Sequence, residues 1–273
     1  SSSSIGNSNA VTQAISALSG GNPAQAAALA ASAIGAAEQL LSTNPAAALA
    51  VAGATVQIIQ PSAVQVGAPP QTETVLTTAA RIFSNPAVVR VQPDQAAALA
   101  TATVRAAVTN GSATIIGNVS NAAVRVAEQI LPSNPTAAVT LASLTVNSVQ
   151  NLPVQQGAPT QTLDIVATAA RILIQPTAQI SPPEQRANLA SSILTVANGA
   201  VVQQQTGGSA VLNTTNNYLQ TNGQIASQVS NFTNATQTPT QQIQTQSPLT
   251  QSERFQDTRP PAEESLIRQA SPT

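Results

Sequence analysis

The chain repeats itself at a spacing of 90 residues, and this repetition limits the architectures it can adopt. Nearly half of the residues at positions 37–100 recur 90 positions later, with no gap in the alignment. The recurring segments are AEQ at 37–39 and 127–129, NP at 44–45 and 134–135, GAP at 67–69 and 157–159, and TAARI at 78–82 and 168–172. Such self-similarity indicates an internal duplication, in which each copy buries its apolar face on a neighbour.

The repeat spacing divides the chain into four predicted parts. Gly20-Gly21 falls opposite Asn110-Gly111, so the first copy extends back to about residue 9. A third copy starts at Pro183 and fades after Gly199. We therefore predict a first helical unit at 9–92, a second at 93–182, a partial or degenerate third at 183–232, and an extended C-terminal arm at 233–273.

Each copy has the pattern of amphipathic helices. The Asn-Pro pair at 44–45 is typical of a helix start, with Asn as the N-cap and Pro at the first helical position. Apolar residues then follow at spacings of three and four, which places them on one helix face. These residues are Leu49, Ala52, Val56 and Ile59, and their counterparts are Val139, Ala142, Val146 and Val149. The pattern predicts an all-α fold of tandem repeats of about 90 residues, with Ala-rich helices and short Pro-containing links. The many β-branched residues favour strands, but the spacing and the lack of hairpin turns outweigh them.

The composition argues against an enzyme. The chain has no His and no Cys, so the common general bases, thiolate nucleophiles and zinc ligands are missing. A pair of carboxylates is the remaining option, but Glu38 and Glu128 occupy the same position in two copies, which indicates repeat architecture rather than one cleft. We expect no enzymatic activity, no catalytic residue, no cofactor and no metal site.

Two charged positions recur in both copies. Glu38 and Arg81 lie on different predicted helices, and Glu128 and Arg171 are their counterparts. In a core built from Ala and Val, a buried guanidinium group needs a partner, because an unpaired buried charge is very costly. We expect Arg81 and Arg171 to bind carboxylates or helix C-terminal carbonyls. The alternative is that both arginines point into water.

The C-terminal part of the sequence differs from the repeats. From position 233 it is a mixture of Gln, Thr and Pro, a composition that does not fold by itself. Seven charged residues follow at positions 253–268, together with Phe255, Leu266 and Ile267. Forty extended residues span about 130 Å. We interpret 233–273 as an arm that docks these three apolar residues on an adjacent copy; the alternative is a free tail.

The low charge of the chain indicates which classes of partner it can attract. Only 7% of the residues are charged and the net charge is −1, so nothing attracts nucleic acid at long range. Low net charge also removes the repulsion that keeps chains apart, which favours self-association. No apolar run reaches the eighteen or so residues that cross a bilayer, and we predict no membrane span.

Two features of the sequence favour a secreted or cell-surface protein. The sequence starts SSSSIGNSN without Met, and its polar residues are Ser, Thr, Asn and Gln with no Lys. In a source that glycosylates its exported proteins, the N-x-[ST] sites would carry glycans at Asn110, Asn118, Asn213, Asn231 and Asn234.

These observations support one functional hypothesis and two alternatives. The hypothesis is a non-enzymatic secreted structural protein that self-assembles through its helical repeats and its arm into an extracellular filament, sheath or matrix. The first alternative is a neutral-surface binder of ice or mineral, which would need a long Thr/Ala face. The second is a carrier of a small apolar ligand, which the scarcity of Phe, Trp and Met disfavours.

Overall fold

The computed structural model describes residues 2–229, and within them every regular element is a helix. No strand occurs in this part of the chain, so the predicted all-α class is confirmed. The helices are α1 (Ser2–Ser19), α2 (Pro23–Gln39), α3 (Pro45–Ile59), α4 (Ser62–Gly67), α5 (Pro69–Phe83), α6 (Pro86–Val91), α7 (Pro93–Asn110), α8 (Ala113–Ile130), α9 (Pro135–Ser148), α10 (Leu152–Gly157), α11 (Pro159–Ile174), the 3₁₀ helix η1 (Pro176–Ile180), α12 (Pro183–Ala197), α13 (Ala200–Gln203) and α14 (Gly208–Thr221). The chain is helical again at 223–229.

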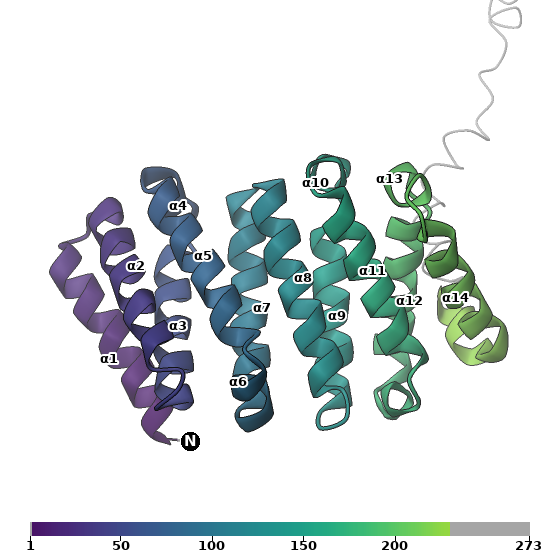
Figure 1. The fold of residues 1–273 in the computed structure, drawn as a ribbon, viewed down its shortest axis with the longest axis horizontal. Helices are drawn as coiled ribbons and strands as arrows, with labels where there is room; N and C mark the ends of the chain where they lie inside the picture. Colours follow the sequence, from purple (N-terminus) through teal and green to yellow (C-terminus); the bar gives the residue numbers. More distant parts are fainter. Residues whose placement is uncertain (1, 230–273) are drawn as a thin grey trace, which may run out of the picture. The chain divides into compact units, whose positions relative to one another are not determined.

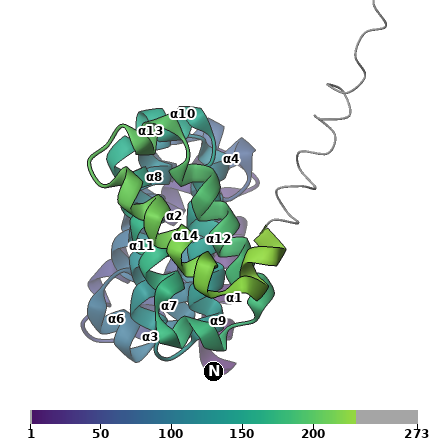
Figure 2. The same ribbon diagram turned by 90° about the vertical axis from the view of Figure 1, so that its right-hand side faces the viewer.

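The long helices alternate between two layers in chain order (Figure 1). One layer consists of α2, α5, α8, α11 and α14, and the other of α1, α3, α7, α9 and α12. Within each layer every helix contacts the one before it and the one after it, and each also packs on the opposite layer. Figure 2 views this stack from the side of α14. Residues up to Val229 therefore form one compact unit.

The predicted helix starts are confirmed where Asn precedes Pro. Asn44 accepts a hydrogen bond from the backbone N–H of Ala47 at 3.1 Å, and Asn134 accepts one from Ala137 at the same distance. The following proline takes the first helical position, where its missing N–H costs nothing. The predicted stop of α7 is also present, because Gly111 adopts a φ of 80° that favours glycine.

The predicted apolar faces form the core. The eight residues that the spacing assigned to α3 and to the corresponding segment of the second copy are all buried. Thr side chains enter the same core, and their hydroxyls donate to carbonyls three or four residues earlier in the same helix. The fully buried examples are Thr55, Thr72, Thr103, Thr145, Thr162 and Thr215. This local bond satisfies the hydroxyl, so the β-branched residues that favoured strands are accommodated in helices.

The Pro-containing links are more ordered than expected. The segments that follow α3 and α9 fold into the short helices α4 and α10. Each contains a buried glutamine, and Gln65 Nε2 donates to the carbonyl of Ala106 on α7 at 3.1 Å. Proline therefore lies at the start of both short helices, as the N-cap of α4 and in the first turn of α10.

The helix boundaries follow the 90-residue spacing of the sequence. The helices α3, α4, α5 and α7 begin 90 residues before α9, α10, α11 and α12 respectively. Each interval of 90 residues contains two successive pairs of long helices, one helix of each pair in each layer. No helix in residues 2–229 has the length and apolar character that a membrane span requires.

The apolar arm residues Phe255, Leu266 and Ile267 lie outside the residues that the structure describes, as do the sequons at Asn231 and Asn234.

Candidate functional site

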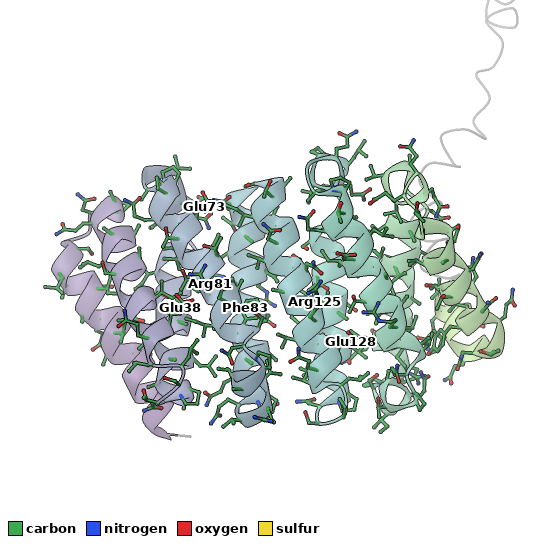
Figure 3. The ribbon with its side chains drawn as sticks, viewed as in Figure 1. Glu38, Glu73, Arg81, Phe83, Arg125 and Glu128 are labelled. Carbon is green, nitrogen blue, oxygen red and sulfur yellow. The ribbon has the colours of Figure 1, made fainter. Side chains whose placement is uncertain are left out.

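The first pair of recurring charges joins α5 to α2. Arg81 Nε lies 2.7 Å from Glu38 Oε1, and Arg81 Nη2 donates to Glu38 Oε2 at 3.2 Å. The same Nη2 donates to the hydroxyl of Thr78 at 3.0 Å. Figure 3 shows both charged side chains between the two helices. The guanidinium group therefore holds the carboxylate with two parallel hydrogen bonds, the arrangement that gives an Arg pair its geometric specificity.

The second pair has the same geometry between α11 and α8. Arg171 Nε lies 3.0 Å from Glu128 Oε1, and Nη2 lies 3.3 Å from Oε2. Thr168 accepts a hydrogen bond from Nη2 at 3.0 Å, as Thr78 does in the first copy. The structure thus brings the four charged residues together two by two, once in each copy.

The expected burial of these arginines is wrong. The side chain of Arg81 is 59% exposed and that of Arg171 is 54% exposed. The pairs lie at the surface of their layer, where a long side chain covers apolar atoms and keeps its charged group in water. An exposed pair contributes at most about 1 kcal/mol, because water screens it. The hydrogen bonds from Arg81 lower the pKa of the Glu38 carboxyl, although partial burial opposes this shift.

A shallow groove surrounds the second pair. Arg125 on α8 and Asp164 on α11 line it together with Glu128 and Arg171, and its volume is about 400 Å³. It therefore combines two cationic and two anionic groups. The first copy has Gly35 and Thr74 at the positions of Arg125 and Asp164. Arg125 and Asp164 were not predicted as site residues because their charges occur in one copy only. The spacing of Arg125 and Glu128 nevertheless places both on one helix face.

A second polar cluster lies between η1, α12 and α14. Arg186 Nη1 donates to Gln179 Oε1 at 2.6 Å, and the Tyr218 hydroxyl donates to the same oxygen at 3.0 Å. Gln179 and Tyr218 also line an open cleft of about 640 Å³ with Ile174 and Asn217. The sequence contains no repeated signal for this cluster, since the residue opposite Arg186 in the second copy is Ala96.

The polar groups of these two clusters are engaged with one another. In residues 2–229 no three His, Cys, Asp or Glu side chains lie close enough to hold a metal ion. The Glu38 and Glu128 carboxylates are engaged by guanidinium groups, and the Tyr218 hydroxyl by an amide oxygen. The arrangement provides fixed dipoles and ion pairs on the surface of a helical stack.

Three of the predicted glycan sites lie within the described residues. Asn110 is the last residue of α7, whereas Asn118 and Asn213 lie within α8 and α14. Asn118 and Asn213 are exposed, and Asn118 Oδ1 accepts a hydrogen bond from Gln161 at 3.1 Å.

Comparison with protein-family models, with curated proteins and with solved structures finds no match for this chain.

Proposed function

We propose that this is a non-enzymatic structural protein built from tandem helical repeats of about 90 residues, which assembles with copies of itself into a filament, sheath or matrix. In this proposal the helical units 9–92 and 93–182 and the partial unit 183–232 form the body. The arm at 233–273, with Phe255, Leu266 and Ile267, connects one copy to another. The protein works outside the cell or at its surface.

One observation carries the proposal: the same contact is built twice, 90 residues apart. The Glu38–Arg81 bridge between α2 and α5 returns as the Glu128–Arg171 bridge between α8 and α11, with the same pairs of atoms. In a repeat stack each pair of helices buries its apolar face on a neighbouring pair, so an end that is left uncovered can be covered by another subunit.

The surface composition supports association. The described residues contain six acidic and six basic side chains, so long-range repulsion between copies is weak. The rest of the polar surface consists of Ser, Thr, Asn and Gln without Lys, and this composition supports the extracellular part of the proposal.

Negative-stain microscopy and sedimentation velocity of the full chain test the proposal. We expect long uniform assemblies whose amount rises with protein concentration. Monodisperse monomers at all concentrations up to about 100 µM, well above a micromolar dissociation constant, would overturn it.

A chain truncated after Phe232 tests the role of the arm separately. Residues up to Val229 form a compact unit with its own core, so we expect unchanged helical circular dichroism and loss of the long assemblies. Unchanged polymerisation of the truncated chain would assign the contacts to the helical repeats alone.

A further inference from the structure

The helices α2 and α8 are equivalent in sequence but differ in what covers them. α8 lies in the middle of its layer, between α5 and α11. α2 is the first helix of the same layer and has α5 on one side. The side of α2 that corresponds to the α5-facing side of α8 has no helix of its own layer against it in residues 2–229 (Figure 1).

The exposure of equivalent residues shows the consequence. On α8, Val119, Val126 and Ile130 lie on one face and are at most 1% exposed. Their counterparts on α2 are equally apolar, yet Leu29 is half-buried, Ala36 is exposed and Leu40 is 38% exposed. Ala33 shows the same change, because its counterpart Ala123 is completely buried. We call Leu29, Ala33, Ala36 and Leu40 the α2 end face.

The other end of the stack has the opposite character. The exposed residues of α14 are mostly polar, and none of the large apolar side chains between positions 208 and 229 is exposed. They include Asn213, Asn216, Asn217 and Gln220. A polar outer helix is the usual cap of a repeat stack. α14 therefore closes its end against further packing, whereas α2 presents the apolar surface that elsewhere in the same chain is covered by a helix.

We propose that the α2 end face is a contact between two copies of the chain, related by a two-fold axis. The polar α14 end does not match it, which disfavours head-to-tail stacking, and the surface that does match it is the same face of a second copy. Ala33 and Ala36 allow two helices to approach closely, so Leu29 and Leu40 of each copy fill the space above the alanines of the other. The contact repeats between chains the covering that α5 gives α8 within one chain.

This inference rests on the self-association proposed above and specifies one of its contacts. A two-fold contact closes after two copies, so it yields pairs and not filaments. Longer assemblies then require a second contact, which the proposal assigns to residues 233–273.

Cross-linking of the full chain tests the inference directly, because the natural chain has no Cys. Ala33→Cys places a single thiol at the middle of the α2 end face, and a short bis-maleimide reagent should join two copies in high yield. Asn216→Cys, on the polar face of α14, is the matched control and should give no covalent pair. Two results would overturn the two-fold contact. One is a covalent link between Ala33→Cys and Asn216→Cys chains in a mixture, which would indicate head-to-tail packing. The other is the absence of a covalent Ala33→Cys pair when the chains still assemble.

A second measurement does not depend on cross-linking. The double substitution Leu29→Gln and Leu40→Gln should raise the dissociation constant of the pair by about tenfold or more in sedimentation equilibrium, because it places amides in an apolar contact. Val66→Gln, at an apolar residue that is 80% exposed on α4, should leave the constant unchanged. Leu29 and Leu40 are not fully buried, so the double variant should still fold. Its melting temperature is the control that checks this. An unchanged constant in the double variant would contradict the inference while leaving self-assembly intact, whereas a full chain that never associates would contradict both proposals.

Discussion

The two GAP segments are identical in sequence but differ in how closely the chain packs around them. In the second copy, a Cβ atom added at Gly157 would collide with the Cβ of Ala113 at the start of α8. In the first copy, a Cβ at Gly67 would lie at an ordinary van der Waals distance of 3.8 Å from Pro23 on α2. The first copy also has Ala27 where the second has Gly117, and a Cβ at Gly117 would come within 2.7 Å of Ala158.

The difference shows that identical residues on equivalent helices experience different constraints. The helices next to the GAP segments and the ion pairs recur in both copies, so the tighter packing comes from the residues on the facing helix. In the second copy, glycines at two positions let α8 approach α10 and α11, and no side chain fills the space between them. We expect substitutions at equivalent positions to cost more in the second copy than in the first.

The largest expected difference concerns these glycines. Gly157→Ala should destabilise the protein by about 1–3 kcal/mol, because α8 or α10 must move to admit the methyl group. For a folded unit of this size, the melting temperature should fall by about 2–4 °C per kcal/mol. Gly67→Ala is the matched control and should change stability by at most about 0.5 kcal/mol. Equal shifts for the two variants in thermal melts would show that the packing difference is absent.

The next difference lies in a buried hydrogen bond that only the second copy contains. Ser120 Oγ and Ser148 Oγ lie 2.7 Å apart, whereas the first copy has Ala30 and Ile58 at these positions. Ser120→Ala should cost about 1 kcal/mol, the net value of one such bond. Ser148 keeps its bond to the carbonyl of Thr145, so no hydroxyl is left unsatisfied. A double-mutant cycle with Ser148→Ala in chemical denaturation would expose a coupling; no coupling would contradict a direct contact.

The ion pairs should contribute equally to the stability of the two copies. Arg81→Met and Arg171→Met remove the same three hydrogen bonds, two to a Glu carboxylate and one to a Thr hydroxyl. Each substitution should cost about 0.2–1 kcal/mol, less in high salt. The two pairs use different helices and share no partner, so the double variant should show the sum of the single effects. Urea unfolding at low and high ionic strength measures this. A loss of several kcal/mol in one copy only would mean that the pair in that copy is not a surface pair.

The smallest effect is a dependence on pH. Because Arg81 lowers the pKa of Glu38 below its ordinary value of 4.5, the pair stabilises the folded chain above that value. The contribution is lost as the pH falls and Glu38 becomes protonated through its lowered pKa. The melting temperatures of the natural chain and of Arg81→Met should therefore differ more at pH 7 than at pH 3. A difference that is the same at both pH values would show that ionised Glu38 does not contribute.

Local signals were sufficient for much of the fold. The Asn-Pro pairs predicted helix starts because capping involves only neighbouring residues, and the spacing of apolar residues predicted which faces of α3 and α9 are buried. The helices α4 and α10 were missed because the prolines at their starts were interpreted as breaks. Pro61 is the N-cap of α4 and Pro153 lies in the first turn of α10, and both positions are compatible with a helix.

The candidate sites depended on tertiary packing and were predictable only in part. The repeated spacing of Glu and Arg selected four residues that the structure brings together in pairs. Their exposure was not predictable, because it depends on which side of a layer each helix turns outward. Arg125, Asp164 and the cluster of Arg186 with Tyr218 occur once each, so the repeat gave no signal for them.

The asparagine caps have a consequence for the chemical durability of the chain. Asn22, Asn44 and Asn85 each cap a helix and are each followed by proline, as is Asn134. Deamidation of asparagine normally proceeds by attack of the next residue's backbone nitrogen on the side-chain amide, and a proline nitrogen cannot make this attack because it carries no hydrogen. The proline at each helix start therefore also protects the capping asparagine from deamidation by this route.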